Sequence, residues 1–463
     1  MGANGTAGPL APHAGAGGRV ARIGLISVHT SPLDRPGTGD GGGLNVYVRE
    51  VARRMAARGV EVDVFTRRTG PEDAGTVELA PGARVHHIEA GPSTVVAKED
   101  AANLLCAFLL AMERHPAVAG LDVLHAHYWL SGWVGRRLAE RTGIPLVQTF
   151  HTLGTLKNAA LAPGDRPEPP LRLYAEEEVA RAADRVLVLT CGEARLFHRS
   201  FGLSGARLTV VPAGVDLDLF HPDADDPAAD VVAPRQRRDD PELLFAGRLQ
   251  PLKGPDLAVR ILAEVRRRVP GARLRIVGGA SGDLGMTPVA LTALAEELGV
   301  AEAVAFEPAL DQAALAARYR AADVVLVPSR TETFGLVALE AQACGTPVVA
   351  AAVGGLTAVV GEGGTLVEGH DPADHAAAVL AYLEDPGLAA AAGAAGVRTG
   401  RAASWEHTVD RLLAAYEDVV REMAAVREAA LPAVPDAPEA PEASATTADP
   451  VASVASVAPG SAR

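Results

Sequence analysis

Residues 328–345 read PSRTETFGLVALEAQACG and follow directly on the apolar run 322–327. A buried strand that ends in a polar turn and passes into a helix is typical of a parallel α/β sheet, whose carboxyl-edge loops bind ligands. Glu332 and Glu340 are separated by about two helical turns, so both point along the same face. Paired carboxylates suit a polyhydroxylated ligand, because each accepts hydroxyl hydrogen bonds. The alternative is that each is only a solvated charge near a helix end.

The spacing E-x7-E, followed by ACGTPVVA at 343–350, resembles the donor-sugar motif of retaining GT-B glycosyltransferases, and the similarity runs over about 20–423. It is most similar to the D-inositol 3-phosphate glycosyltransferase branch, which attaches N-acetylglucosamine to inositol phosphate in the first step of mycothiol biosynthesis. The resemblance implies an α/β protein of GT-B architecture, with two doubly wound Rossmann-like domains that face each other across a cleft.

Composition narrows the class of protein. A chain of 463 residues with 48% apolar content predicts two cores, and a formal net charge of −14 argues against a nucleic-acid partner. Cys106, Cys191 and Cys344 form no disulfide or metal-binding spacing, which indicates a reducing compartment. No apolar run is long enough to span a membrane. We therefore expect a cytoplasmic protein without a membrane span.

Strand and helix signals alternate along the chain, as in parallel sheets. In the first half we expect strands at 20–28, 60–65, 84–88, 123–125, 145–149, 185–189 and 208–212, with helices at 44–58, 99–114, 132–141, 172–183 and 193–201. In the second half we expect strands at 243–246, 273–277, 304–306, 323–327 and 348–351, and a final helix at 405–423.

These signals predict the domain boundaries. A Pro/Asp-rich connector begins at 214, so we expect an N-terminal acceptor domain at 19–213 and a C-terminal nucleotide-sugar donor domain at 214–402. The resemblance implies that a helix at 403–426 returns to complete the first domain. The low-complexity ends, 1–18 and 427–463, are predicted to be disordered.

A glycine-rich turn precedes the first helix. Gly37, Gly39 and Gly42 fit the dinucleotide fingerprint G-x-G-x-x-G by letter, but about eight residues separate them from the strand, so a dehydrogenase is the weaker interpretation. Successive glycines at 41–43 favour a loop whose backbone N–H groups approach a phosphate at the helix N-terminus. A plain flexible turn is the alternative.

Three histidines, His125, His127 and His151, follow two neighbouring strand ends. They lack an acidic fourth ligand and the helical spacing of zinc motifs, so a metal site is disfavoured. His151 at a strand end is better placed to hydrogen-bond a sugar hydroxyl.

Lysine is rare in this chain. Of 43 basic residues only Lys98, Lys157 and Lys253 are lysine, which suggests that these positions need a compact ammonium group. Arg248 and Lys253 flank a helix start between glycines, a combination suited to a diphosphate. Because these cations can stabilise a diphosphate leaving group, we expect no required cofactor. Mg²⁺ could bind but is not expected to be catalytic, and no metal-ligating residue is assigned.

The resemblance also implies roles for individual residues. The residues implied in acceptor binding are His29, Asp40, Asn45, Lys98, Tyr128, Thr152 and Arg172. Those implied in donor binding are Gly43, Arg248, Lys253, Glu332 and Glu340. We assign catalytic roles to His151, Arg248, Lys253 and Glu332. Gly354 and Gly355, after a strand, are expected to offer backbone N–H groups to phosphate.

The expected activity is transfer of N-acetylglucosamine from UDP-GlcNAc to 1D-myo-inositol 3-phosphate with retention. The segment 148–157, QTFHTLGTLK, also resembles sucrose-phosphate synthase-like transferases, so another phosphorylated sugar acceptor such as fructose 6-phosphate is the alternative. A nucleotide-sugar sensor without catalysis would be signalled by loss of Lys253 or Glu332, and both are present. A homodimer is left open.

Overall fold

The computed structural model describes residues 19–37, 39, 41–97, 100–161, 166–222, 239–279 and 286–430. Met1–Met423 form one compact unit and Ala424–Arg463 a second. The predicted tails at 1–18 and 431–463 lie outside the described residues, as do Asp40 and Lys98. The C-terminal tail was predicted to start at 427, which is wrong, because the last helix continues to Ala430 through a run of good helix formers.

The first half of the chain builds a sheet that, within the described residues, has eight strands in the order β3-β4-β2-β1-β5-β6-β7-β8. Neighbours are parallel except β3 and β4, which pair antiparallel. The strands are β1 (Arg22–Ile26), β2 (Glu61–Arg67), β3 (Thr76–Ala80), β4 (Ala83–Ile88), β5 (Val123–His127), β6 (Leu146–Thr149), β7 (Arg185–Val188) and β8 (Leu208–Val210).

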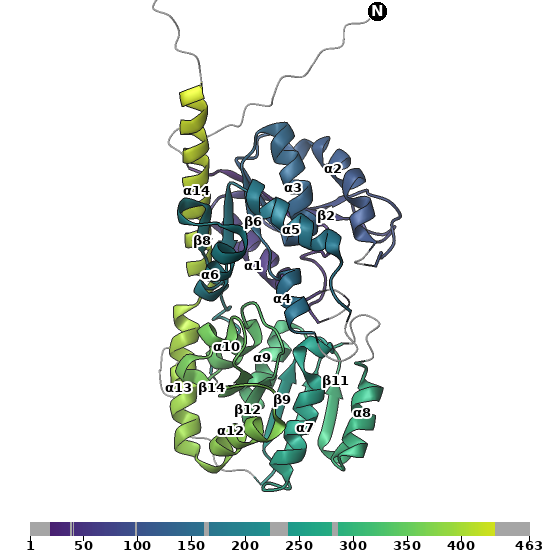
Figure 1. Cartoon of the computed structure of the whole chain (residues 1–463), viewed down its shortest axis with the longest axis vertical. Helices are drawn as coiled ribbons and strands as arrows, with labels where there is room; N and C mark the ends of the chain where they lie inside the picture. Colours follow the sequence, from purple (N-terminus) through teal and green to yellow (C-terminus); the bar gives the residue numbers. More distant parts are fainter. Residues whose placement is uncertain are drawn as a thin grey trace, which may run out of the picture. The chain divides into compact units, whose positions relative to one another are not determined.

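Helices cover the faces of this sheet (Figure 1). They are α1 (Gly43–Ala57), α2 (Leu105–Glu113), α3 (Tyr128–Thr142), α4 (Gly154–Ala159), α5 (Pro170–Ala182) and α6 (Cys191–Phe201), with 3-10 turns η1 (Ala101–Leu104), η2 (Pro116–Val118) and η3 (Gly205–Arg207). Val48, Val51 and Met55 of α1 are fully buried, and their i, i+3, i+7 spacing explains why this helix packs one face on the strands.

The second half builds a sheet that, in the described part of the chain, is parallel throughout with the order β11-β10-β9-β12-β13-β14. Its strands are β9 (Glu242–Ala246), β10 (Arg273–Val277), β11 (Val304–Glu307), β12 (Val324–Val327), β13 (Val348–Ala351) and β14 (Gly364–Val367). Its helices are α7 (Pro255–Arg266), α8 (Pro288–Glu297), α9 (Gln312–Ala321), α10 (Leu336–Ala343), α11 (Leu356–Val359), α12 (Pro372–Glu384) and α13 (Pro386–Ala402), with 3-10 turns η4 (Pro251–Lys253), η5 (Ala301–Ala303) and η6 (Gly361–Gly363).

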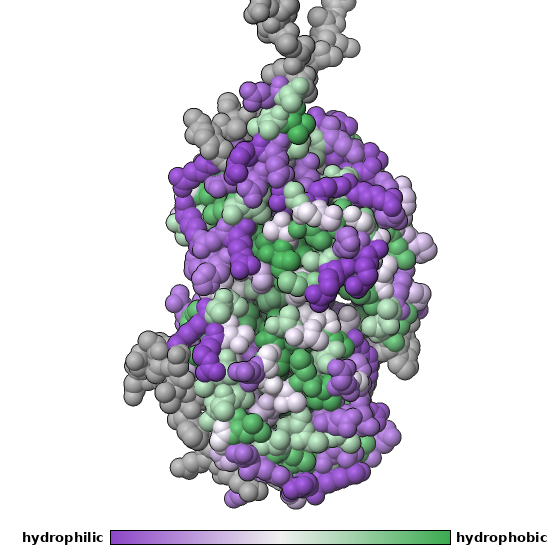
Figure 2. Space-filling model, turned by 60° about the vertical axis from the view of Figure 1, so that its left-hand side comes forward, coloured by the Kyte–Doolittle hydropathy of each residue, from purple (hydrophilic) through white to green (hydrophobic). Residues whose placement is uncertain are grey.

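The alanine-rich helix α13 packs on α10, the helix of the E-x7-E motif. Figure 2 shows pale and green residues gathered over this half of the chain, among purple hydrophilic side chains.

In the part of the chain that the structure describes, no helix combines the length and the apolarity that a membrane crossing needs.

The last helix, α14 (Trp405–Ala430), starts where the chain passes for a second time between its halves. Val215 and Ser404 form an isolated parallel bridge, so the two connecting segments lie side by side. Beyond it, Trp405 packs edge-on against Tyr47 of α1 at 5.5 Å between ring centroids, and Arg185 of β7 donates to Glu422. From Trp405 to Glu422, α14 therefore packs against the elements of the first sheet.

Both sheets reverse their strand order at one point. The reversal lies between β1 and β5 in the first sheet and between β9 and β12 in the second, which confirms the α/β fold class expected from the sequence. Loops that leave neighbouring strands at such a point diverge and leave room for a ligand. Candidate residues from the sequence follow the strands at these two points. His29 and Tyr128 come after β1 and β5, and Arg248 and Glu332 come after β9 and β12.

Candidate active site

Lys253 and Glu332 meet at the carboxyl edge of the second sheet. Lys253 ends η4 directly before α7, and its Nζ lies 2.5 Å from Oε2 of Glu332, in the loop after β12. The two side chains are 30% and 17% exposed, so both can reach a ligand. This pairing brings together two residues that the sequence assigned to donor binding and catalysis.

The loop that carries Glu332 is fixed to the start of α7. Arg330 makes a two-pronged ion pair with Asp256, at 2.8 and 3.1 Å, and its backbone N–H donates to the carbonyl of Leu252. Sequence reasoning missed this pair, since nothing in the local pattern links residues so far apart. Its effect is to hold Glu332 near Lys253.

Gly354 and Gly355 support the same loop from the other side. A Cβ on Gly354 would lie 1.9 Å from the carbonyl oxygen of Glu332, and the N–H of Gly355 donates to that oxygen at 2.9 Å. The sequence led us to expect N–H groups free for phosphate, and for Gly355 this is wrong, because the Glu332 carbonyl already accepts its hydrogen.

Glu340 is buried in α10, with 7% of its surface exposed. Burial raises its pKa to about 7, an effect opposed by the hydrogen bond that the Tyr319 hydroxyl donates to Oε2 at 3.0 Å. Glu332 and Glu340 therefore lie in different surroundings, one partly exposed beside a lysine and the other enclosed beside a tyrosine.

The N-terminus of α1 lies against this donor side. A Cβ on Gly42 would be 3.5 Å from Nε of Arg248, and a Cβ on Gly43 would be 3.3 Å from Leu336 of α10. A Cβ would thus make ordinary contact at Gly42 and a tight one at Gly43. The structure places Arg248, assigned to donor binding, beside Gly42, the residue before the donor-binding candidate Gly43.

Asn45, implied in acceptor binding, is 1% exposed and its amide is used inside the protein. Nδ2 donates to the carbonyl of Ser31 at 2.6 Å and to the hydroxyl of Thr30, while Oδ1 accepts from the N–H of Gly42 at 2.9 Å. These bonds close the glycine-rich turn onto the start of α1. Asn45 therefore has a structural role in this turn, which the sequence analysis did not predict.

Four residues implied in acceptor binding gather at the carboxyl edge of the first sheet. The Arg172 guanidinium lies over the Tyr128 ring at 4.9 Å, and its Nη2 donates to the carbonyl of Thr152 at 3.2 Å. The ring of His29, after β1, contacts the Tyr128 ring in a tilted arrangement, with 4.6 Å between ring centroids. Of the remaining acceptor candidates, Asp40 and Lys98 lie outside the described residues.

Arg172 is 1% exposed, although it carries a permanent charge. Glu176, one helical turn onward, accepts from its Nε at 2.7 Å, and Glu168, four residues before, lies 2.8 Å from its Nη1. Sequence reasoning missed both glutamates. The spacing R-x3-E from Arg172 to Glu176 was a usable signal, because residues four apart on a helix are neighbours, whereas Glu168 precedes α5 and no helical spacing predicts its contact.

Tyr128 and His151 have a strained backbone. Among the described residues they are the non-glycine positions with positive φ, at 74° and 60°. Each stands just beyond the end of a strand, β5 or β6, beside the reversal point of the sheet. Such strain costs energy and tends to be kept where it positions a functional side chain.

The three histidines do lie together, and both nitrogens of His125, Nδ1 of His127 and Nε2 of His151 contact protein groups, whereas Nε2 of His127 is buried without a hydrogen-bond partner among the described residues. His127 Nδ1 lies 3.0 Å from His151 Nε2, while His125 contacts the hydroxyls of Tyr416 and Thr149 at 2.6 and 2.8 Å. Burial lowers the pKa of His125 and of His151 to about 3, so both are neutral at pH 7. Among the described residues no group of His, Cys, Asp and Glu is arranged to hold a metal ion.

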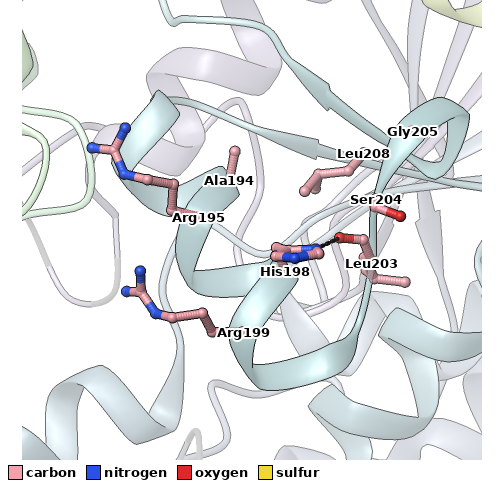
Figure 3. A pocket seen from close by; sticks show the side chains of 8 residues that line it. All are labelled: Ala194, Arg195, His198, Arg199, Leu203, Ser204, Gly205 and Leu208. Carbon is pink, nitrogen blue, oxygen red and sulfur yellow. Dashed lines mark hydrogen bonds between the residues drawn. The ribbon is translucent and has the colours of Figure 1, made fainter.

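A separate depression of about 450 Å³ lies on the outer side of α6 (Figure 3). Arg195 and Arg199 project at its rim, and His198 contacts the carbonyl of Leu203 at 3.0 Å. It is formed at the C-terminal end of α6, where the chain turns toward β8. This is the amino edge of the sheet, opposite the edge that carries Tyr128 and His151.

Comparisons with known proteins agree with this geometry. The family described as "Glycosyl transferases group 1" matches residues 230–398, and the "Glycosyl transferase 4-like domain" matches residues 42–214. The chain is 48% identical over 426 residues to the D-inositol 3-phosphate glycosyltransferase of Thermomonospora curvata, covering 89% of this chain and 99% of that protein.

Two further relatives are informative. The D-inositol 3-phosphate glycosyltransferase of Geodermatophilus obscurus is 49% identical over 424 residues, which cover 89% of this chain and 92% of the relative. Among solved structures, sucrose-phosphate synthase from Thermosynechococcus elongatus superposes with a TM-score of 0.77 at 33% identity, covering 88% of this chain and all of that one.

Proposed function

Since the chain belongs to the D-inositol 3-phosphate glycosyltransferase family and is a glycosyltransferase of GT-B fold, we propose that it transfers N-acetylglucosamine from UDP-GlcNAc to 1D-myo-inositol 3-phosphate with retention. This reaction would be the first step of mycothiol biosynthesis. The curated relatives match over nearly their whole length, which supports the activity of the whole enzyme and not only of one domain.

The observation that carries the acceptor assignment is the buried cation at the edge of the first sheet. A guanidinium that is 1% exposed is costly to desolvate, and such charges are kept where they meet an anion. Tyr128 and Thr152 add polar groups around Arg172. Together they suit a phosphate monoester, which needs several charge-assisted hydrogen bonds when it leaves water.

The donor side supplies positive charge where the leaving group forms. When the glycosidic bond to UDP breaks, negative charge grows on the diphosphate, and Lys253 and Arg248 stabilise it by their positive charge. Glu332 accepts a hydrogen bond from the ammonium of Lys253 and, in this proposal, also accepts hydrogen bonds from sugar hydroxyls. In this proposal Glu340 holds donor hydroxyls, and His151, neutral at pH 7, hydrogen-bonds the transferred sugar.

A panel of donors and acceptors tests the proposal. UDP-GlcNAc, UDP-glucose and GDP-sugars are each incubated with inositol 3-phosphate, free inositol and fructose 6-phosphate, and nucleotide release is measured. We expect UDP-GlcNAc with inositol 3-phosphate to react fastest, and free inositol to react poorly. NMR of the product should show the α-configuration of the donor retained, and a β-linked product would rule out the retaining mechanism.

A second candidate activity is transfer to another phosphorylated sugar. It is favoured by the sucrose-phosphate synthase structure, which is similar over its entire length at 33% identity. Faster reaction of fructose 6-phosphate than of inositol 3-phosphate in the panel would establish this alternative. Both candidates use a phosphate monoester, so the socket around Arg172 serves either one.

We place the enzyme in the cytoplasm as part of the proposal, on the cysteine pattern described for the sequence. Its substrates would be the UDP-sugar and the phosphorylated polyol. The homodimer left open by the sequence stays a prediction, to be tested by light scattering of the purified chain.

A further inference from the structure

Glu168 bridges two cations at the acceptor edge. Its Oε1 accepts a hydrogen bond from Nζ of Lys157 on α4, and its Oε2 lies 2.8 Å from Nη1 of Arg172 on α5. The backbone of Glu168 is fixed too, since its N–H donates to Asn158 Oδ1 at 2.7 Å. Burial alone would raise the pKa of Glu168, but Arg172 and Lys157 outweigh burial and lower it, so this carboxylate is ionised at pH 7.

One nitrogen of the Arg172 guanidinium, Nη1, remains for a ligand. Nε donates to Glu176 and Nη2 donates to the carbonyl of Thr152. Nη1 is buried, lies near Glu168, and makes no aligned hydrogen bond to any residue that the structure describes. An anion that binds Arg172 must therefore approach on the side of Nη1, where the Glu168 carboxylate already lies.

A phosphate monoester would need the same two cations. Its oxygens can bridge a guanidinium and an ammonium as the two oxygens of Glu168 do. A carboxylate and a phosphate dianion that share these cations repel each other strongly where water is largely excluded. Binding of one therefore weakens binding of the other.

Resting on the function proposed above, we propose that Lys157 is a further acceptor-phosphate residue and that Glu168 occupies the place of the phosphate until the acceptor displaces it. This exchange makes the site selective for doubly charged acceptors. A neutral polyol cannot compete for Arg172 and Lys157 with the resident carboxylate, whereas a phosphate dianion can.

Substitutions of Glu168 and of Lys157 should change the KM for inositol 3-phosphate in opposite directions. Glu168→Gln removes the competing charge at nearly constant size, so the KM for inositol 3-phosphate should fall about fivefold. Lys157→Met removes one cation and should raise that KM about tenfold, while Lys157→Arg should restore most of it. The KM for UDP-GlcNAc should stay unchanged in all three. Steady-state kinetics give both constants, and calorimetric titration with inorganic phosphate should show the same order of affinities without turnover.

Glu177→Gln is the matched control. Glu177 lies on the same helix but pairs with Arg181 near the surface, with 43% of its side chain exposed, so its substitution should leave every constant unchanged. Thermal melting of each variant checks that the fold is intact. If the Glu168 variant fails to fold, the Lys157 variants still test the exchange through the loss of a cation. If the Lys157 variants fail to fold, Glu168→Gln still tests it through the loss of the competing charge.

The results of these experiments distinguish a failure of this inference from a failure of the proposed function. If the wild-type enzyme prefers inositol 3-phosphate but Glu168→Gln raises its KM, Glu168 orients the cations and the exchange is wrong. If neither substitution changes KM or phosphate affinity, Lys157 and Glu168 lie outside the socket. If the wild type uses free inositol as well as the phosphate, the proposed function itself fails.

Discussion

Tyr128 and His151 are the residues at which this fold departs from relaxed geometry, with positive φ at 74° and 60°. Neither is a glycine, so surrounding contacts must hold each in place. Tyr128 is held between His29 and Arg172, and His151 by a contact with His127. We interpret the strain as the cost of aiming these side chains along the sheet edge.

His127 sets the hydrogen-bonding state of His151. One imidazole must donate across the 3.0 Å between Nδ1 of His127 and Nε2 of His151, so the tautomer of His151 is coupled to that of His127. His127→Phe keeps the ring but removes this bond, so we expect kcat to fall about tenfold through misplacement of His151. His127→Asn retains a polar atom near Nδ1 and should recover part of the loss. Equal kcat in the Phe variant and the wild type would show that the contact is only structural.

Lys253→Ala tests the donor assignment at a single residue. Loss of one contact that stabilises the leaving diphosphate should cost about 3 kcal/mol, so kcat/KM should fall on the order of a hundredfold or more while the protein stays folded. Arg260→Ala, an exposed cation on α7, is the control and should be fully active. A Lys253→Ala enzyme with wild-type turnover would remove Lys253 from the site.

At the scale of elements, α4 and α5 are tied together by Glu176. It is 1% exposed, accepts from Nε of Arg172, and receives the N–H of Gly154, the first residue of α4, at 2.9 and 3.1 Å. The carboxylate therefore positions Arg172 and the start of α4 together. This also makes Arg172→Ala a poor probe of acceptor binding, because it would leave the Glu176 carboxylate buried without its cation.

We therefore predict that Glu176→Ala is strongly destabilising. Removing Glu176 leaves the buried Arg172 with Glu168 as its carboxylate partner and takes away the acceptor of the Gly154 N–H, which should lower the free energy of unfolding by about 3 kcal/mol. Glu177→Ala, next to it in the sequence but near the surface, should change stability by less than about 0.5 kcal/mol. Urea denaturation of both variants measures the difference, and equal midpoints would mean that Arg172 finds another partner.

For the whole molecule, a buried hydrogen-bond chain joins the last helix to the first sheet. Tyr416 of α14 contacts Nδ1 of His125 on β5, and Nε2 of His125 contacts Thr149 on β6. All three side chains are at most 1% exposed. A helix that comes last in the chain is thus part of the support beneath the carboxyl edge.

The buried histidine in this hydrogen-bond chain makes the stability of the folded protein depend on pH. Burial holds the pKa of His125 at about 3, against 6.5 ordinarily, so below pH 6.5 the unfolded chain takes up a proton that the folded chain does not. The free energy of unfolding should then fall with decreasing pH, by up to about 1.4 kcal/mol per pH unit from this residue. Urea denaturation between pH 7 and 5 should show a shallower slope in His125→Gln and no such change in His407→Gln, an exposed control. Parallel slopes in His125→Gln and the wild type would contradict this.

The enzyme as a whole should work without a metal ion. We expect Lys253, Arg248 and the glycine-rich start of α1 to supply the positive charge that a divalent cation provides elsewhere. Treatment with excess EDTA should leave the rate of UDP release within about twofold of the untreated enzyme. Activity that vanishes with EDTA and returns with Mg²⁺ would show that the cations are insufficient.

The sequence by itself determined the alternation of buried strands and helices, and with it the strand ends at which most candidate residues stand. Apolar runs, glycines and helix starts act over short stretches, so pattern alone locates them. It missed β3, α4 and β14, which are short, partly exposed or rich in glycine, because their pairing partners rather than their own propensities stabilise them. It also assigned no bounds to the helices α8, α9, α12 and α13 of the second half.

Only the tertiary structure decided what each polar group contacts. Asn45 closes a turn, the N–H of Gly355 supports Glu332, Glu168 bridges Lys157 and Arg172, and Tyr416 contacts His125, which lies 291 residues earlier in the chain. A hydrogen bond or ion pair depends on which groups meet within about 3 Å after folding. That proximity is set by how sheets and helices pack, which no local pattern of residues encodes.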